Sequence, residues 1–387
     1  MGDGTCAIDR CRPRSPARPV SDHLAAEVLH LGRADKAVWR CCALHDTTRY
    51  QQLHRIWNKN EIKTMSSNLF KRINGPIGLI VSILVLVVMF SILNPRFGSI
   101  ENLQNVLYQS SVPLIVVVGA TLVIQMGSID LSVEGVMGAA GMAWILLSPN
   151  TRLDSDIGAW AWVVAIGLGL AVGLLSGIVH AKLTVPSFVV TLGTWYVGLG
   201  IAILLYGNDM LPTLTNETLA RWPSRLSLGL PNSFWLAAVV MVCGILTSNF
   251  TSFGRGVLAV GNNESIARAS GMSVDRIKIA AFAVAGCLSG LAGILATMQL
   301  GSGSPDIGFG QLFTVIPAAV IAGTALGGGE GGVTRSVLGV FLLIILNNGL
   351  VLAGVDPDFQ TGVFGTILII AIVAVAWPER ARLKVAK

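Results

Sequence analysis

Residues 112–148 read VPLIVVVGATLVIQMGSIDLSVEGVMGAAGMAWILLS, and this stretch decides the fold. Two apolar runs, 112–126 and 134–148, are separated only by a short polar segment from Gly127 to Val133. A helix that crosses the bilayer core upright needs about 20 apolar residues, so each run is short for a span. Short or glycine-interrupted runs are expected where membrane helices surround a cavity. The pair is therefore predicted to be a hairpin or a broken membrane helix.

Eight further apolar runs extend the pattern along the chain. Hydrophobic residues make up 53% of the sequence and charged residues 12%, whereas soluble domains carry roughly 25% charged residues. A bilayer must therefore solvate much of the surface. We predict an all-α integral membrane protein with about ten transmembrane helices in one compact bundle. The further runs are 77–93, 159–179, 187–206, 233–248, 278–298, 312–326, 336–353 and 362–377.

Glycines recur at every fourth position in two of these runs. Gly169, Gly173 and Gly177 do so in one run, and Gly286 and Gly290 in another. Small residues at this spacing let two helix backbones approach closely in a membrane. We therefore predict helix packing, and no ligand, at these positions.

The distribution of Lys and Arg predicts the orientation. If ten spans alternate from an inside N-terminus, the outside segments hold only Arg96, Arg152, Arg221 and Arg225 near the membrane, and the inside segments hold most of the other basic residues. Loops rich in Lys and Arg stay in the cytoplasm. Both termini are expected to be cytoplasmic. This bias also explains the formal net charge of +6, so no nucleic-acid partner is expected.

Residues 1–64 differ from the rest of the chain. They are polar, are rich in Arg and Cys, and lack the apolar core of a signal peptide. They are interpreted as a disordered cytoplasmic extension, or as sequence ahead of a translation start at Met65, which we favour. The transmembrane domain is then 65–387. Four residues of the extension could be zinc ligands, but adjacent cysteines suit tetrahedral coordination poorly, so no metal site is predicted: Cys41, Cys42, His45 and His54.

No nucleotide-binding or catalytic motif is recognisable. A P-loop needs a Gly-Lys pair to hold the phosphates, and the glycine-rich segment 327–332 lacks the lysine. We read that segment as a flexible or tightly packed turn. His180 is the only histidine after residue 64, so a catalytic triad or a histidine metal site cannot be assembled. No enzyme activity and no cofactor are expected on this chain, and an ATPase that drives it must be a separate chain.

The apolar runs contain almost no charge. Ion-coupled carriers usually place ionisable groups in the membrane, so an uncharged polar lining favours a neutral polyhydroxyl solute. Asp130 and Glu134 are placed at the ends of the predicted turn, away from mid-helix positions. Asp130 and Ser132 hold that turn or lie beside the pathway, and Asn347 lines the pathway or hydrogen-bonds between helices. The candidate pathway or turn residues are Gln125, Asp130, Ser132, Asn347 and Asn348.

The polar inside loop 249–277 contains a predicted short helix. Asn263 is a good N-cap, Glu264 is acidic in the first turn, and Gly271 can end the helix in the left-handed conformation. The segment is a solvated connector or a docking helix for a cytoplasmic partner. Its weakly apolar face is predicted to consist of Ile266, Ala267 and Ser270.

Three segments resemble the ribose-type ABC importer permeases. Residues 127–134 are similar to the Gly-Gly-Ile-Asp-Leu-Ser-Val-Gly segment of that family. The other two are 259–276, which leads into 281–296, and 346–360, which contains Leu-Asn-Asn-Gly-Leu, Gly354-Val355 and Gln360. The resemblance runs from about residue 76 to 377 and keeps the order and spacing of all three. Departures from the family pattern occur at Ser128, Glu134 and Arg335.

The resemblance implies the permease subunit of a bacterial ABC importer for a monosaccharide or related polyol in the inner membrane. It implies two cytoplasmic ATP-binding subunits that bind ATP and Mg, a periplasmic sugar-binding protein facing 207–232 and 299–311, and a second permease copy in a homodimer or heterodimer. It further implies that the segment near 262–276 is a coupling helix that touches the ATPase. The residues given this role are Asn262, Asn263, Glu264, Ala267, Arg268, Gly271, Asp275 and Arg276.

Three alternatives remain open. An ABC permease for branched-chain amino acids belongs to the same broad superfamily and differs in its binding protein. A stand-alone secondary carrier transports without an ATPase. A membrane enzyme needs paired catalytic groups inside the bilayer.

Overall fold

The computed structural model describes residues 76–153, 155–208 and 210–356, together with the single positions 359, 362, 363, 365, 366, 369 and 373. Two predictions concern residues outside this set, namely the extension at 1–64 and most of the apolar run at 362–377. Gln360 of the third resembling segment also lies outside it.

Helices make up nearly all the regular structure of the described residues. An apolar chain in a membrane must satisfy its backbone hydrogen bonds internally, and a helix does so within one segment. The elements are α4 (Pro76–Leu93), the 3-10 helix η2 (Pro95–Gly98), α5 (Ile100–Gln125), α6 (Val133–Leu146), α7 (Trp160–Lys182), α8 (Ser187–Tyr206), α9 (Glu217–Arg221), the antiparallel strands β1 (Leu226–Ser227) and β2 (Leu230–Pro231), α10 (Asn232–Phe250), α11 (Ser252–Asn262), α12 (Glu264–Ala269), α13 (Val274–Leu300), α14 (Gln311–Ile321) and α15 (Val333–Leu352).

Six of the described helices, α5, α7, α8, α10, α13 and α15, are long and apolar enough to cross a membrane. Three shorter apolar helices, α4, α6 and α14, accompany them. The predicted class, an all-α multi-pass membrane protein, is therefore confirmed. The number ten stays a prediction, because three helices are short and the last apolar run falls largely outside the described residues.

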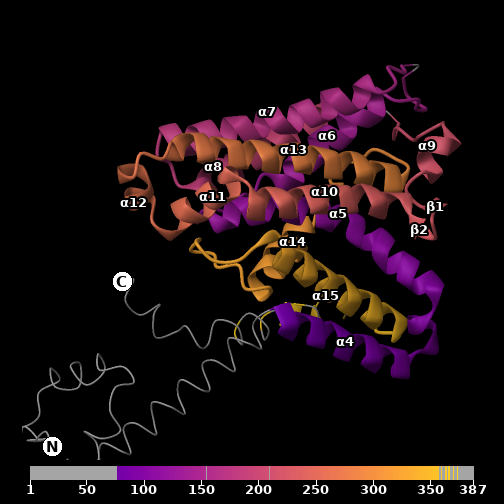
Figure 1. Cartoon of the computed structure of the whole chain (residues 1–387). Helices are drawn as coiled ribbons and strands as arrows, with labels where there is room; N and C mark the ends of the chain where they lie inside the picture. The colour runs from indigo at the N-terminus through magenta and orange to yellow at the C-terminus, as the bar shows by residue number, and fades with distance from the viewer. Residues whose placement is uncertain are drawn as a thin grey trace, which may run out of the picture. The chain divides into compact units, whose positions relative to one another are not determined.

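The described helices form two groups around α5. In the first group α13 packs against α7 and α6, and α6 packs against α8. In the second group α14 packs against α15, and α15 packs against α4. Figure 1 shows the two groups on opposite sides of α5 and α10. We call them the α13 group (α6, α7, α8 and α13) and the α15 group (α4, α14 and α15).

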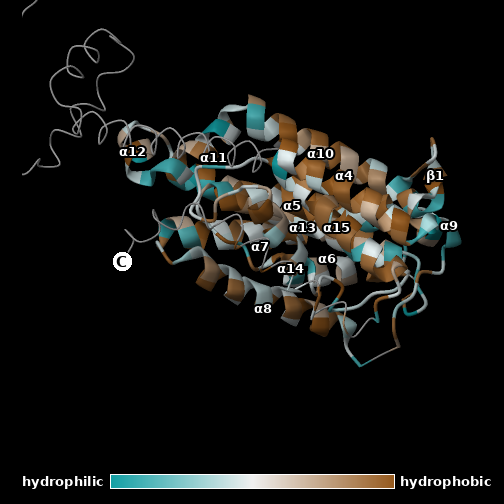
Figure 2. Cartoon of the chain, turned by 90° about the horizontal axis from the view of Figure 1, so that it is seen from below, coloured by the Kyte–Doolittle hydropathy of each residue, from teal (hydrophilic) through white to brown (hydrophobic). Residues whose placement is uncertain are grey.

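Polar residues gather at the two ends of the bundle. Hydrophobic colouring runs along the lengths of the helices, and hydrophilic residues concentrate near α11 and α12 at one end and near α9 at the other (Figure 2). We call these the α12 end and the α9 end. This distribution is typical of helices whose middle parts lie in hydrocarbon.

The chain turns back between α5 and α6 without forming a packed hairpin. α5 begins near Gly229 at the α9 end, where Gln104 donates to its carbonyl, and ends where the Gln125 carbonyl accepts from Gly329. α6 returns to the α9 end, where Asn150 pairs with Leu214. However, α6 packs mainly against α7, α8 and α13. The predicted hairpin and broken helix each describe part of this arrangement, which is a reversal followed by a short helix inside the bundle.

The recurring glycines lie where α7 meets α13. A Cβ added to Gly173 would lie 3.1 Å from the Cα of Gly286, and one added to Gly286 would lie 2.8 Å from the Cα of Gly173. Real Cβ atoms have no room at the shorter of these distances. The two backbones therefore touch directly, and the predicted packing role of these glycines is confirmed.

Gly169→Ala is expected to destabilise the protein, whereas Gly167→Ala in the same helix is not. A Cβ at Gly169 would press on the Gly286 carbonyl oxygen and lie 3.1 Å from the Gly290 Cα, whereas a Cβ at Gly167 meets nothing within 4 Å. Overpacking costs about 1–3 kcal/mol, whereas replacing a helical Gly by Ala in open space gains about 0.5–1 kcal/mol. Unfolding of the detergent-purified variants measures the difference, and equal stability of the two would contradict the close backbone contact.

Candidate functional site

The predicted short helix forms as α12 and is capped at both ends. The side chain of Asn263 accepts a hydrogen bond from the Ile266 amide at 3.1 Å. At the other end the Gly271 amide donates to the Arg268 carbonyl at 3.1 Å, and Gly271 has φ +81°. A side-chain N-cap and a left-handed glycine are the usual ends of a stable helix. The predicted roles of Asn263 and Gly271 in ending this helix are confirmed.

Four ion pairs form a chain of contacts at this end: one lies within α12, two join α12 to α13, and one joins α13 to α7. Lys278 contacts Glu264 at 2.7 Å, and Arg268 contacts Glu264 at 3.2 Å and Asp275 at 2.8 Å. Lys182, in the last turn of α7, contacts Asp275 at 3.7 Å. The charges alternate in sign along this chain of contacts, so each group is attracted to both of its neighbours. We call the five residues the ion chain.

Lys278 gives the ion chain its least exposed contact. Its side chain is only 11% exposed, against 44% for Glu264 and 53% for Arg268. The hydrogen bond from Lys278 is the main cause that holds the pKa of Glu264 below its usual value, and Arg268 lowers it further. Asp275 and Glu264 together raise the pKa of the Arg268 guanidinium. At neutral pH the Glu264 carboxylate and the Arg268 guanidinium are therefore charged, and charge-assisted hydrogen bonds hold α12.

One part of the predicted docking face is wrong. Ala267 is only 5% exposed and packs with Val257, Val260 and Phe282, whereas Ile266 is 63% exposed. Successive residues of an α-helix lie about 100° apart, and here this rotation turns Ala267 into the bundle and Ile266 outward. Ala267 therefore anchors α12 to the bundle, and Ile266 is the large apolar side chain that α12 presents outward.

The glycine-rich turn at 327–332 packs tightly beside α11. The Gly329 amide donates to the Gln125 carbonyl at 2.8 Å. The exposed Asn262 donates from its side chain to the Leu258 carbonyl at 3.0 Å and to the Gly329 carbonyl at 3.4 Å. Of the two alternatives for this segment, the packed turn is observed. Arg276, the remaining candidate for partner contact, is exposed near the start of α13.

Asp130 and Ser132 hold the turn that precedes α6. Asp130 Oδ1 accepts from the Ser132 amide at 2.9 Å and from the Ser132 hydroxyl at 2.6 Å, and both residues are buried. The turn-holding role is therefore observed. Among the described residues, the other Asp130 oxygen and both amide atoms of the Gln125 side chain are buried without a hydrogen-bond partner.

The two neighbouring asparagines of α15 differ in their surroundings. Asn348 is 3% exposed, and its side-chain oxygen accepts from the Asn102 amide group at 3.0 Å. This hydrogen bond joins α15 to α5, as polar side chains often do between membrane helices. Asn347 is exposed. The structure thus gives Asn348 a role between helices and places Asn347 on the surface of the described chain.

Glu134 flanks the turn and stands at the start of α6, as predicted, and the structure adds that this position lies inside the bundle. It is the second residue of α6 and is 7% exposed. With a rise of about 1.5 Å per residue, it lies roughly 18 Å from the α9 end of α6. Its Oε1 atom accepts from the Leu312 amide at 3.1 Å. The short polar segment at 127–132 therefore carries a carboxylate deep into the bundle, which apolar runs alone do not reveal.

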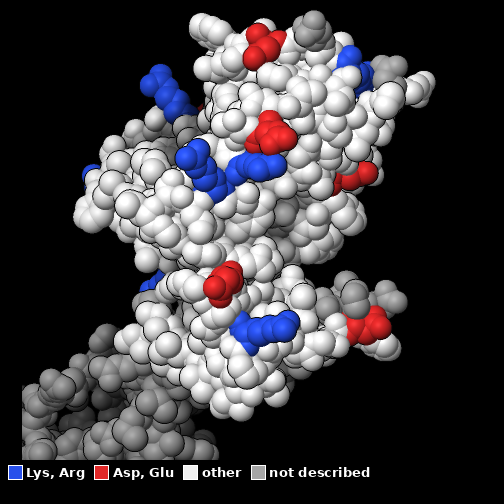
Figure 3. Space-filling model, turned by 90° about the vertical axis from the view of Figure 1, so that its right-hand side faces the viewer, with Lys and Arg blue, Asp and Glu red and all other residues white. Residues whose placement is uncertain are grey.

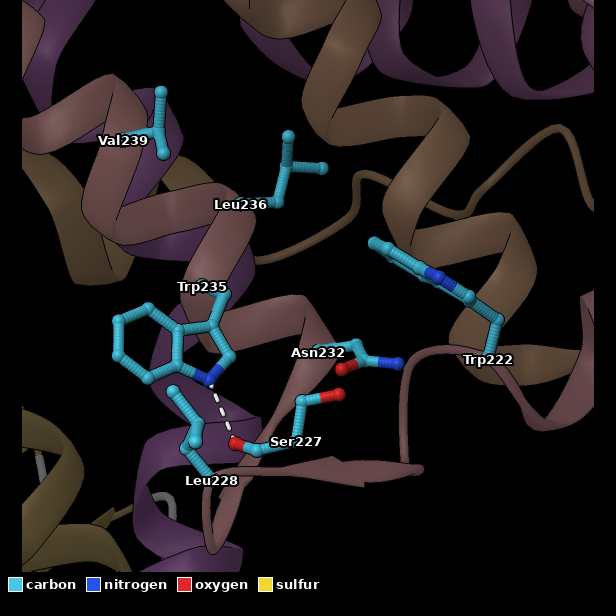
Figure 4. Close-up of a pocket in the computed structure, with 7 residues that line it drawn as sticks. All are labelled: Trp222, Ser227, Leu228, Asn232, Trp235, Leu236 and Val239. Atoms are coloured by element: carbon cyan, nitrogen blue, oxygen red, sulfur yellow. Dashed lines mark hydrogen bonds between the residues drawn. The ribbon is translucent and has the colours of Figure 1, made fainter.

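The α9 end carries an open hollow beside α10. It has a volume of about 480 Å³ and is lined by Trp222, Ser227, Leu228, Asn232, Trp235, Leu236 and Val239. Trp235 Nε1 donates to the Ser227 carbonyl at 2.9 Å, which fixes the indole against the β1–β2 turn (Figure 4). The lining has no charged residue, and the hollow opens to the surface. It can accept an apolar or aromatic surface group but does not enclose a small solute.

The face at the α9 end is weakly charged. Figure 3 shows scattered side chains of both signs on a surface that is otherwise uncharged, and the outline narrows between an upper and a lower part. The exposed pair Arg221 and Glu217, 3.0 Å apart, belongs to this end. The charge pattern therefore differs from that of the α12 end, where five charged side chains form one chain of contacts.

Comparison with known proteins identifies the class. Residues 102–372 match the family described as "Branched-chain amino acid transport system / permease component". This match covers most of the chain, including α5 to α15 and therefore the ion chain and Glu134. The protein belongs to this permease family. No solved structure matches the chain.

Individual relatives show which transport proteins the chain is similar to. The chain is 33% identical to the ribose import permease protein of Escherichia coli K12 over 299 residues, which are 76% of this chain and 91% of that protein. It is 31% identical to the L-arabinose transport system permease protein of the same organism over 320 residues, 82% and 95% of the two chains. A probable ABC transporter permease protein of E. coli K12 is 36% identical over 298 residues, 77% and 88%. The protein is a membrane permease subunit of the ABC importer class.

The sequence did not give every residue of these sites its observed role. Lys182 and Lys278 carry the basic half of the ion chain but read in sequence only as orientation signals at helix ends. The exposure of Ile266 depends on how the six-residue helix α12 is rotated about its axis, and the two caps do not determine this rotation. Glu134 needed the contact with Leu312, which is 178 positions away in sequence.

Neutralising the partly buried pair Glu264 and Lys278 is expected to show coupling. The free energies of unfolding of Glu264→Gln, Lys278→Met and the double variant should deviate from additivity by about 1 kcal/mol, because charge-assisted hydrogen bonds with a shielded partner are worth more than exposed ones. The matched control is the exposed pair Glu217 and Arg221, with an expected coupling of about 0.3–0.5 kcal/mol. Additive effects at Glu264 and Lys278 would show that the ion chain does not hold α12.

Proposed function

We propose that this chain carries a monosaccharide or related polyol across the bacterial inner membrane, as the permease subunit of an ABC importer powered by ATP hydrolysis on separate subunits. The observation that carries the proposal is the similarity over 91% of the length of the ribose import permease protein. A second relative, named for L-arabinose transport, is matched over 95% of its length. Both solutes are neutral polyols, in keeping with the scarcity of charge in the apolar helices.

The proposed topology has ten membrane helices and both termini in the cytoplasm. Lys182, Arg268 and Lys278 lie at the α12 end, and basic residues are retained on the cytoplasmic side. We therefore assign the α12 end to the cytoplasm and the α9 end, with loop 207–232, to the periplasm. The domain assignment, with an extension at 1–64 and a membrane domain at 65–387, belongs to the same proposal.

We place the ATP-binding subunit at α12. The exposed Ile266 provides an apolar anchor there, and the ion chain ties α12 to the ends of α13 and α7. A partner that displaces α12 must therefore displace these membrane helices as well. ATP and Mg bind on that partner, and this chain has no ATPase site of its own. The remaining proposed partners are a periplasmic sugar-binding protein at the α9 end and a second permease copy.

A branched-chain amino acid is the second candidate solute, because the matching family is described by that substrate class. A zwitterionic solute needs groups that pair with its carboxylate and ammonium ends. Within the described helices that could cross the membrane, charged residues are few. This favours the neutral polyol. A stand-alone carrier is the remaining alternative and would need no ATP-binding partner.

Uptake by proteoliposomes tests the solute class. The chain is reconstituted with its proposed ATP-binding and solute-binding partners and assayed with radiolabelled D-ribose, L-arabinose, D-galactose, D-xylose and L-leucine. We expect uptake of at least one monosaccharide to rise at least tenfold when ATP is supplied on the side of the vesicle membrane that carries the ATP-binding subunits. ATP-driven uptake of leucine alone would support the amino-acid alternative, and sugar uptake without ATP would support the carrier.

Replacing Ile266 by Arg is expected to reduce capture of the ATP-binding subunit from membranes at least tenfold, because a charge then occupies the apolar contact. Leu228→Arg is the matched control, since Leu228 is 91% exposed at the α9 end. The control should capture the ATP-binding subunit as the unaltered chain does. Equal capture by both variants would show that the partner does not contact α12 through Ile266.

A further inference from the structure

Two short helices begin inside the bundle and meet at one carboxylate. α6 and α14 have 14 and 11 residues, about 21 and 17 Å, so neither crosses the roughly 30 Å hydrocarbon core by itself. Glu134 stands in the first turn of α6, and Leu312 is the second residue of α14. The hydrogen bond from the Leu312 amide to Glu134, at 3.1 Å, joins the two beginnings.

Glu134 supplies the cap that α14 lacks. The residue before α14 is Gly310, with φ +87° and no side chain that could accept from the first amides. The backbone amide of Leu312, in the first turn of α14, donates to the Glu134 carboxylate. A negative charge is stabilised at a helix N-terminus, and here one carboxylate lies at two of them. No described Lys or Arg forms an ion pair with Glu134.

The chain around this contact fits without spare room. A Cβ added to Gly308 would lie 2.7 Å from the Glu134 carbonyl oxygen and 2.8 Å from its Cα. One added to Gly138, a turn further along α6, would press on the Pro305 carbonyl oxygen. Residues 303–310 lead into α14 and therefore pack against α6, from its α9 end to Glu134.

The contact also joins the two groups of helices. α6 packs mainly within the α13 group, and α14 packs mainly against α15 and α5. Among the described residues, the bond between Glu134 and Leu312 is the side-chain hydrogen bond that links α6 to α14. An ionisable group deep in a membrane is costly, and such groups usually have a function. The attraction between the Glu134 carboxylate and the Leu312 amide is strongest where water is excluded.

We propose that Glu134 is a positioning residue for transport. It holds the N-terminus of α14 against α6 and so joins the α13 group to the α15 group in the state described here, and this hydrogen bond breaks and re-forms as the two groups separate in each transport cycle. The inference rests on the proposed function, because it assigns the residue a part in ATP-driven solute movement. Glu134 acts through α14 and does not touch the solute.

The variants Glu134→Gln and Glu134→Leu test this role in the complete reconstituted importer. The amide oxygen of Gln can still accept from Leu312 but without charge, and Leu cannot accept at all. We expect the number of sugar molecules moved per ATP hydrolysed to fall about threefold in the first variant and at least tenfold in the second, with KM unchanged. Glu101→Gln is the matched control, because Glu101 is an exposed first-turn carboxylate of α5 outside the two loops assigned to the sugar-binding protein.

The outcomes separate this inference from the proposed function. If Glu134→Gln lowers both the capture of the ATP-binding subunit and the number of sugar molecules moved per ATP, the role is purely structural and the inference is overturned. An unchanged number of sugar molecules per ATP in both variants would also overturn it. A raised KM with an unchanged maximal rate would place Glu134 in contact with solute and also overturn it. If Glu134→Leu fails to insert, Glu134→Gln decides. If the unaltered chain moves no sugar with ATP, the proposed function fails and this inference fails with it.

Discussion

Direct contact between helix backbones is the constraint on which the rest of the structure depends. In a membrane the hydrophobic effect does not draw helices together, so close packing at small residues must do so. Gly169, Gly173 and Gly286 bring α7 against α13, and Gly293 brings α13 against Met137 of α6. The same device recurs in the other group, where Gly339 of α15 meets the backbone of Ala318 in α14. Close packing therefore determines the positions of the helices more than polar contacts do. The few polar contacts can serve other functions.

The position of α13 makes one such polar contact consequential. Its first turns carry Asp275 and Lys278, which hold α12 through the ion chain, and its middle is locked to α7 and α6 by glycine contacts. A helix moves as a rigid body when its hydrogen bonds are kept. Force applied at α12 thus reaches α13 through the ion pairs that bridge the connection 270–273, and α13 packs directly on α6 and α7. This is what a subunit needs if the energy source lies on another chain.

Sequence alone predicts those features that are local. The apolar runs, the glycine spacing at 169 and 173, and the caps of α12 at Asn263 and Gly271 all depend on residues a few positions apart. They are found wherever the structure describes the chain. The face of α12 was misassigned at Ala267 because a six-residue helix takes its rotation from tertiary packing. The ion chain and the partner of Glu134 were missed because their members are brought together only by the fold.

The hydrogen bond between Glu134 and Leu312 also explains how the bundle tolerates two short helices, α6 and α14, that begin inside it. Each helix that begins inside hydrocarbon leaves amides that must find acceptors. For α6 the acceptor is local, since Asp130 binds the Ser132 amide just before the helix, whereas Gly310 offers α14 nothing of the kind. A distant carboxylate therefore completes α14, and it can do so only while α6 stays beside it. The stability of one short helix thus depends on the position of another, so any motion that separates them leaves α14 without its cap and favours their return.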